Sequence, residues 1–164
     1  MTESETERPS EPWKYPYVAG LIDGGSNLTV TVKKAEDTRV GYSIVIQLRV
    51  SNTDPTMLGF LDEFCSEHGL EPVTRDSGDT FVLSINKRDD LLELLRLVEP
   101  YLIDRFPEAE ILMNDLLPGL KAGKGSSKEG FYELMEYVDA IRAETNAGSN
   151  PKYDQAYFES EWDM

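Results

Sequence analysis

Two stretches of alternating apolar and polar residues constrain the fold of this chain most strongly. In the first, Leu28, Val30 and Val32 alternate with polar residues. In the second, residues 42–50, apolar side chains again occupy every other position. Because successive side chains of a strand point to opposite faces, this period of two predicts two amphipathic strands, joined by a turn around residues 36–40.

Helical periodicity and Gly, Pro and Asn boundaries predict the remaining elements. Helices are expected over residues 13–23, 55–68, 89–98, 107–117 and 128–144, and a second hairpin over residues 72–86. The order is therefore α-β-β-α-β-β-α with two further helices. Four amphipathic strands in two hairpins predict an α+β fold, in which one antiparallel sheet carries helices on one face and leaves the other face open.

The two ends of the chain differ from its middle. Residues 1–12 are acidic and lack apolar periodicity, which predicts a disordered tail. Residues 13–146 form the expected domain. Residues 147–164 are acidic, and their aromatic side chains predict that this segment docks on the domain or on a partner subunit. These aromatic residues are Tyr153, Tyr157, Phe158 and Trp162.

The open face of the predicted sheet carries side chains that form hydrogen bonds. They are Asn27, Thr29, Thr31, Lys33, Ser43, Gln47 and Arg49. Side chains of these types read base edges in the DNA major groove, which admits a two-stranded ribbon. An ordinary solvated sheet face is also polar, so the pattern alone leaves both interpretations open.

The charge of the chain is strongly acidic. Sixteen Lys and Arg residues stand against 31 Asp and Glu residues, a formal net charge of −15, which excludes a globally basic nucleic-acid-binding domain. Acidic residues spread along the chain favour a halophilic source, where molar salt shortens the Debye length to about 3 Å and weakens repulsion from DNA. Residues 24–53 nevertheless carry a local net charge of +2.

Several classes of protein are excluded by what the sequence lacks. Cys65 is the only cysteine and His68 the only histidine, which excludes a disulfide framework and a Cys/His zinc site. No apolar run approaches the length of a membrane span, and the acidic N-terminus is unlike a signal peptide. We therefore expect a cytoplasmic protein that does not contact a membrane.

The segment VAGLIDGGS, residues 18–26, followed directly by the first hairpin, resembles the signature helix of the LAGLIDADG homing endonucleases. The element order, the Glu-Pro-Tyr-Leu sequence at residues 99–102 and the helix over residues 128–146 extend the resemblance. It implies an αββαββα saddle that binds double-stranded DNA. Since one motif is present, it also implies a homodimer in which Ala19 and Gly20 let two motif helices pack closely. The alternative for these two residues is tight packing within one chain.

The resemblance also implies a cleavage site, from which this chain departs. In the family, a carboxylate at the end of the motif helix binds a divalent metal ion beside the scissile phosphate, and Mg²⁺ is usually held by one or two carboxylates. Here Gly25 occupies that position. Asp23 matches the first acid of the motif and is a candidate catalytic residue and substitute metal ligand.

Two further catalytic candidates follow from the resemblance. Asn52 matches a polar residue that orders water, with a helix cap as its alternative role. Arg105 matches a basic residue near the phosphate, with a surface ion pair as its alternative.

The leading interpretation is sequence-specific DNA binding, with Mg²⁺-dependent cleavage expected from the resemblance and opposed by Gly25. The alternatives are a non-catalytic DNA-binding regulator and an RNA maturase-like splicing helper. A small-molecule sensor is disfavoured, because no Gly-rich ligand loop follows a strand.

Overall fold

The computed structural model describes residues 11–145 and 151–164. Its elements are α2 (Lys14–Gly25), β1 (Ser26–Lys34), β2 (Tyr42–Asn52), α3 (Pro55–Glu67), β3 (Val73–Asp76), β4 (Phe81–Ile85), α4 (Arg88–Val98), η2 (Glu99–Tyr101), α5 (Phe106–Ile111), the π-helical turn η3 (Leu112–Leu116), α6 (Leu117–Lys121), η4 (Lys124–Ser126), α7 (Lys128–Thr145) and α8 (Gln155–Glu161). No helix within the described residues is long and apolar enough to cross a membrane.

The four strands form one sheet in the order β1-β2-β4-β3. Strand β4 pairs antiparallel with both β2 and β3. Buried and exposed residues alternate along β1 and β2, because apolar side chains occupy one face and polar side chains the other. The predicted α+β class, the antiparallel sheet and the inward-facing apolar residues are thus confirmed.

The chain divides into two compact units, and the boundaries between them fall inside β1 and β2. The first unit contains the described residues up to Asn27 and Leu48–Arg105. Its core is formed by apolar side chains of α2, α3, α4, β2 and β4. The largest of the fully buried side chains in this core are Ile22, Leu61, Phe64, Leu83, Ile85, Leu91 and Leu94.

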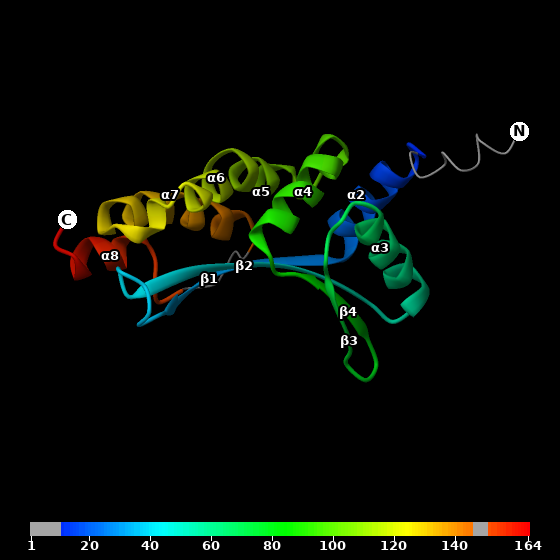
Figure 1. Ribbon diagram of the computed structural model, residues 1–164, viewed down its shortest axis with the longest axis horizontal. Coiled ribbons are helices and arrows are strands. Elements are labelled where there is room, and N and C mark those ends of the chain that lie inside the picture. The colour runs from blue at the N-terminus through cyan, green and yellow to red at the C-terminus, as the bar shows by residue number, and fades with distance from the viewer. Residues whose placement is uncertain (1–10, 146–150) are drawn as a thin grey trace, which may run out of the picture. The chain divides into compact units, whose positions relative to one another are not determined.

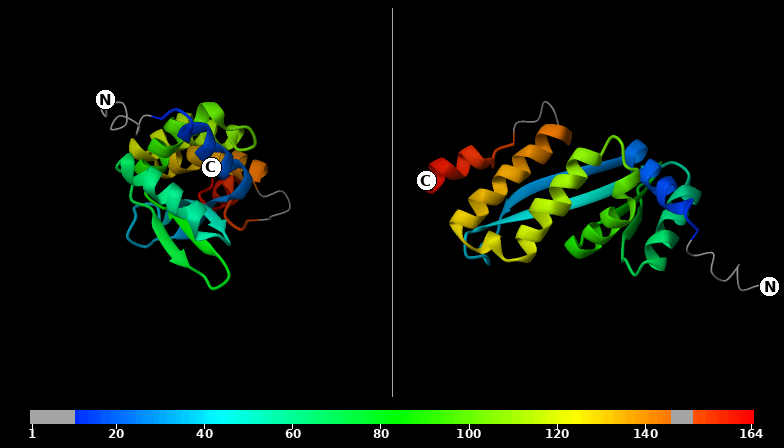
Figure 2. Two further views of the ribbon diagram at one scale, coloured as in Figure 1. Left: turned by 90° about the vertical axis from the view of Figure 1, so that its right-hand side faces the viewer. Right: turned by 90° about the horizontal axis from the view of Figure 1, so that it is seen from above.

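The second unit contains Leu28–Gln47 and the described residues from Phe106 onward. Helices α5, α6 and α7 lie over one face of the β1–β2 hairpin, and no helix of the described residues covers the other face (Figure 1). Helix α8 lies beside α7 (Figure 2). Phe158 of α8 is fully buried, and its ring centroid lies 4.9 Å from that of Tyr42 and 5.2 Å from that of Phe131.

The observed elements differ from the predicted ones mainly at their ends. Helix α2 continues through Gly24 to Gly25, because glycine lowers helix stability without forbidding helical angles. The helix predicted over residues 107–117 continues to Lys121 as α5, η3 and α6. Asp54 caps α3 by accepting a hydrogen bond from the Thr56 N–H group. Residues 1–10 of the predicted tail and residues 146–150 lie outside the described residues.

Candidate nucleic-acid interface

The seven residues predicted on the open face lie on the less buried side of β1 and β2. Ser43 and Gln47 are half-buried, and the other five, Asn27, Thr29, Thr31, Lys33 and Arg49, are exposed. Within the second unit, Thr29 and Gln47 are neighbours, because the Thr29 hydroxyl lies 3.5 Å from the Gln47 carbonyl oxygen. The outward side chains of the two strands therefore lie beside one another here, and they include the exposed apolar side chain of Val45 between Ser43 and Gln47.

Strand pairing in the first unit extends this kind of surface to β3. Arg49 of β2 lies opposite Ser84 of β4, while Ser51 lies opposite Val82, which in turn lies opposite Arg75 of β3. Directly paired residues of an antiparallel sheet share a face, and so do residues two positions apart. Arg75 is exposed and is thus on the same face as Arg49. Sequence reasoning missed Arg75, because only the register of β3 against β4 assigns it to a face.

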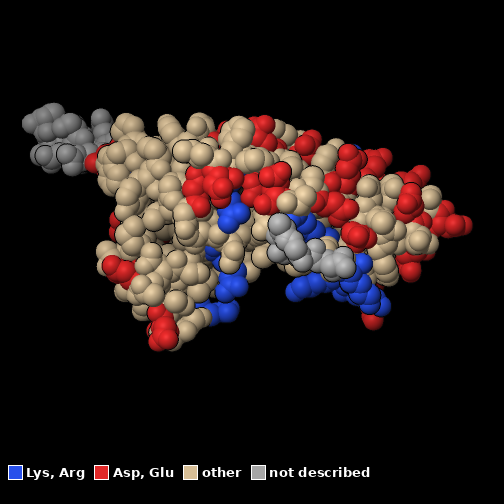
Figure 3. All heavy atoms as spheres, turned by 180° about the vertical axis from the view of Figure 1, so that it is seen from behind, with Lys and Arg blue, Asp and Glu red and all other residues tan. Residues whose placement is uncertain are grey.

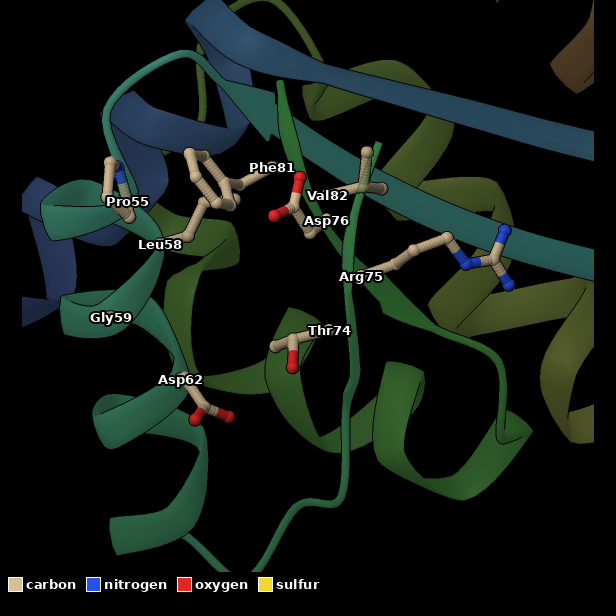
Figure 4. Close-up of a pocket in the computed structure, with 9 residues that line it drawn as sticks. All are labelled: Pro55, Leu58, Gly59, Asp62, Thr74, Arg75, Asp76, Phe81 and Val82. Atoms are coloured by element: carbon tan, nitrogen blue, oxygen red, sulfur yellow. The ribbon is translucent and has the colours of Figure 1, made fainter. Parts of the chain in front are cut away.

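The close-up of a pocket beside β3 shows the opposite face. Here Thr74 and Asp76 point toward α3, whereas Arg75 points away from it (Figure 4). The pocket has a volume of about 310 Å³. It is lined by Pro55, Leu58, Gly59, Asp62, Thr74, Arg75, Asp76, Phe81 and Val82. Its two carboxylates lie on the helix-bearing side of the strands, so they do not offset the charge of the Arg75 guanidinium on the exposed face.

Charge is separated between helices and strands in the second unit. Residues 106–164 contain twelve Asp and Glu residues against five Lys and Arg residues. In the segment 28–47, by contrast, three basic residues stand against two acidic ones. Figure 3 shows acidic side chains over the helices and basic side chains gathered along the strands. The local excess of positive charge predicted for the first hairpin is therefore part of a surface pattern.

The two residues of helix α2 that are predicted at a dimer contact, Ala19 and Gly20, differ in their exposure to solvent. Ala19 is fully buried within the single chain, as the alternative of intramolecular packing requires, and so it presents no surface to a second copy. Gly20 is exposed, and no atom lies within 4 Å of the position of a Cβ atom there. Trp13 and Tyr17, which share this face of α2 with Gly20, are 51% and 43% exposed. The exposed stripe of α2 thus consists of aromatic and small residues without a charge.

Asp23 and Arg105 are joined near the end of α2. The Asp23 carboxylate accepts hydrogen bonds from the backbone N–H groups of Ile103, at 2.7 Å, and of Arg105, at 3.0 Å. The Arg105 guanidinium donates from Nη2 to the carbonyl oxygen of Ser26, at 2.6 Å. The structure therefore brings these two predicted site residues together, and both oxygens of Asp23 hold the backbone that follows η2.

Asn52 lies at the end of β2. Its Oδ1 accepts a hydrogen bond from the Asp54 N–H group at 2.8 Å, and Asp54 in turn caps α3. The capping role considered for Asn52 therefore belongs to Asp54. Asn52 instead stabilises the turn between β2 and α3.

No protein-family model and no curated protein sequence matches the chain. Solved structures do match it. The archaeal intron-encoded homing endonuclease I-Vdi141I, complexed with DNA, aligns over 93% of this chain and 98% of its own, with a TM-score of 0.77 and 19% identity. The homing endonuclease I-CvuI, in complex with an I-CreI target, aligns over 92% and 93%, with a TM-score of 0.79 and 14% identity.

A third match names the family. The LAGLIDADG homing endonuclease I-SmaMI, bound to cleaved DNA, aligns over 88% of this chain and 56% of its own, with a TM-score of 0.65 and 20% identity. The chain has the LAGLIDADG homing endonuclease fold. The fold class predicted from the motif and its following hairpin is confirmed, although sequence identity to these structures is low.

The metal ion that the LAGLIDADG fold implies does not fit the residues at the end of α2. Gly25 supplies no ligand atom from a side chain, and both carboxylate oxygens of Asp23 accept backbone N–H groups. Among residues 11–145 and 151–164, no group of three Asp, Glu, His or Cys side chains is placed to hold a metal ion. The ligand set therefore departs from what Mg²⁺ requires, one or two available carboxylates.

Proposed function

We propose that this protein binds double-stranded DNA sequence-specifically through the exposed polar face of its sheet. The observation that carries the proposal is the composition of this face. Apart from Val45, polar or basic side chains occupy the outward positions of β1 and β2, while acidic residues predominate on the helices of the second unit. Amide and guanidinium groups bind base edges bidentately, and threonine contributes hydroxyl and methyl contacts.

The structural neighbours support DNA as the partner. I-Vdi141I and I-CvuI have the same fold across nearly their whole length and were solved in complexes with DNA. A two-stranded ribbon fits the major groove of B-DNA, whereas the deep, narrow major groove of an RNA duplex does not admit it. Duplex DNA is therefore preferred over the RNA of a maturase-like helper.

The proposed binding species is a homodimer formed through α2. Its exposed stripe of Trp13, Tyr17 and Gly20 carries no charge, in a protein whose net charge is −15. Tyr101 and Ile103 are also exposed, at 48% and 85%, and η2 packs against α2. An uncharged apolar surface of this kind is typical of a protein–protein contact.

We propose further that the wild-type protein binds its site without the metal-dependent cleavage of the family. The reason is the ligand set at the end of α2, in which Gly25 offers no carboxylate and Asp23 is engaged by backbone N–H groups. This favours a DNA-binding regulator over an active nuclease. Cleavage of a bound duplex by the wild-type protein in Mg²⁺ would contradict this part of the proposal.

The binding proposal is tested by selecting duplexes from a random library in molar KCl and measuring their affinity by fluorescence anisotropy. Exchange of Gln47 and Arg49 for alanine should weaken binding of the selected duplex by about 1–3 kcal/mol for each lost bidentate contact. Binding of random DNA should change less. The matched control is Arg96→Ala, because Arg96 is an exposed arginine on helix α4, 3.7 Å from Glu93. Equal effects of both changes would overturn the proposed face.

The dimer is tested by equilibrium sedimentation in molar KCl. Gly20→Arg should convert dimer to monomer, because it places a charge in the α2 stripe. Gly59→Arg is its control: Gly59 is an exposed helical glycine on α3 that also has no atom within 4 Å of its Cβ position. A wild-type monomer at micromolar concentration would contradict the dimer.

A further inference from the structure

Val45 is an apolar side chain at an outward position of β2. It is 38% exposed, and within the second unit the other outward residues of β1 and β2 all carry groups that form hydrogen bonds. Its neighbours in the chain, Ile44 and Ile46, are buried on the opposite face, so Val45 does not contribute to that core. A single exposed valine is common on protein surfaces and by itself identifies no site. The position of Val45 within the proposed DNA-binding face is what gives it a specific partner.

Thr31 lies opposite Val45 on the neighbouring strand. Near the turn of the hairpin, the Ala35 N–H group donates to the Gly41 carbonyl oxygen at 2.8 Å. Equal counts along the two antiparallel strands from this pair reach Thr31 and Val45, and the 3.5 Å contact in the next outward pair agrees with the count. Directly paired side chains have Cβ atoms about 5 Å apart, so Thr31 is close enough to add its methyl group to an apolar contact made by Val45.

The base edges in the major groove offer one distinct apolar group, the C5 methyl group of thymine. The other distinguishing groups there are hydrogen-bond donors and acceptors. A valine side chain forms no hydrogen bond, so opposite a polar base edge it would leave a donor or acceptor without a partner, which is unfavourable. Opposite a thymine methyl group, the same side chain removes apolar surface from water, which is favourable.

We propose that Val45 contacts the C5 methyl group of a thymine at one fixed position of the DNA bound by each copy of the protein. This inference rests on the proposed DNA binding and adds a base preference to it. Because 5-methylcytosine carries the same methyl group at the same place in the groove, the contact also makes binding sensitive to cytosine methylation. A C·G pair at this position is bound more tightly when its cytosine is methylated.

The first measurement uses the wild-type protein and the selected duplex. Each thymine is replaced in turn by deoxyuridine, which lacks only the C5 methyl group and keeps every hydrogen-bonding group of the base. The affinity should fall about fourfold at one position for each protein copy, as expected for one buried methyl group. If specific binding is observed but no thymine responds, the inference is wrong. Absence of any specific binding would instead refute the proposed function, so the two failures are distinguishable.

The second measurement assigns the methyl contact to Val45. Val45→Ala should bind the thymine and deoxyuridine duplexes with affinities within about twofold of each other, because the side chain that contacted the methyl group is removed. A partly unfolded variant would lower both affinities equally and leave their ratio intact. An unchanged fourfold ratio would show that another residue contacts the methyl group, and it would overturn the inference.

Met164→Ala is the matched control for Val45→Ala. Met164 is an apolar residue of the second unit with a similar exposure, 45%, and it lies outside the sheet. Its removal should therefore leave the ratio of the thymine and deoxyuridine affinities at the wild-type value. An equal loss of the ratio in both variants would contradict a specific contact by Val45.

The third measurement tests the response to cytosine methylation. At the responsive position, the T·A pair is replaced by a C·G pair that contains either cytosine or 5-methylcytosine. The two duplexes differ only by the methyl group, so the wild type should bind the methylated one about fourfold more tightly, and Val45→Ala should not distinguish them. Equal wild-type affinities for the two duplexes would contradict the proposed contact.

Discussion

The Ser51 carbonyl oxygen lies 3.9 Å from the position that a Cβ atom on Gly25 would occupy. This is an ordinary van der Waals separation, and the backbone of Gly25 is helical, without a positive φ. A carboxylate side chain at this position therefore meets no steric obstacle. Its cost is electrostatic, since an acid at the C-terminal end of a helix is unfavourable by about 0.3–1 kcal/mol.

Gly25→Asp should accordingly fold with nearly unchanged stability and should acquire a response to Mg²⁺ that the wild type lacks. We expect tighter DNA binding in Mg²⁺ than in EDTA, and cleavage of the selected duplex. Gly24→Asp is the control, because Gly24 is exposed and equally unobstructed but points about 100° away around the helix. If both variants behave like the wild type, restoring this one carboxylate is not sufficient to create a metal site.

Asp23 should prove structural. Asp23→Asn retains one carbonyl oxygen but loses the charge and the second acceptor for the Ile103 and Arg105 N–H groups. Charge-assisted hydrogen bonds contribute about 1.5–3 kcal/mol each, so the free energy of unfolding should fall by about 1–3 kcal/mol. Urea denaturation in molar KCl measures it, with Asp115→Asn, an exposed aspartate, as the control. Unchanged stability would contradict the structural role of Asp23 and would favour its role as a metal ligand.

The sequence was sufficient for the fold because its strongest signals are local. Alternation around Val30 and Ile44 specifies which face of each strand is buried, and the burial in the structure follows it. Gly69, with φ of +76°, follows the end of α3 as the helix-stop pattern predicts. Strand alternation and helix ends depend on residues that are adjacent in the chain, so both can be identified from the sequence alone.

The site was less predictable because its contacts are distant in the sequence. Asp23 meets the backbone of Arg105 across 82 residues, and nothing near either residue indicates that both carboxylate oxygens are used. Ala19 and Gly20 look alike in the motif, yet one faces the core and the other faces solvent. The assignment of Arg75 to a face required strand register, which a hairpin prediction without a fixed turn does not supply.

Arg75 should contribute to DNA binding although β3 is the edge strand. Because it shares the exposed face of the first unit with Arg49, Arg75→Ala should cost about 1–3 kcal/mol if it reads a base, and should alter sequence preference there. Thr74→Ala is the matched control, since Thr74 is its neighbour on the same strand and points toward α3 (Figure 4). Equal affinities for both variants would exclude β3 from the interface.

Cys65 should be inert in the folded protein. Its side chain is fully buried on α3, and burial raises the pKa of its thiol to about 12, with the nearby carboxylates of Asp62 and Asp90 adding to the shift. The thiolate is the reactive form, so a disulfide reagent at pH 8 should label the native protein only as fast as local unfolding exposes Cys65. Since Cys65 is the only cysteine, the absorbance of the thiol released from the reagent reports on this residue alone. Rapid labelling without unfolding would show that α3 is less tightly packed.

Arg142 should be the main support of the outer strand β1 and of the segment before α8. From α7 it donates from Nε to the Val30 carbonyl oxygen, at 3.0 Å, and from Nη1 to the Tyr153 carbonyl oxygen, at 2.7 Å. Both acceptors are backbone carbonyl groups, and each loses this hydrogen bond when the half-buried guanidinium is removed. Arg142→Ala should therefore lower the free energy of unfolding by about 2–4 kcal/mol.

Lysine has a single amino group at the end of a flexible four-carbon stem and does not reproduce this fork, so Arg142→Lys should recover only part of the loss. Arg39→Ala, in the exposed turn between β1 and β2, provides the control and should change stability by less than about 0.5 kcal/mol. Full recovery with lysine would show that charge alone matters at this position. The expected partial recovery would show instead that the geometry of two simultaneous donors joins α7, β1 and the C-terminal segment.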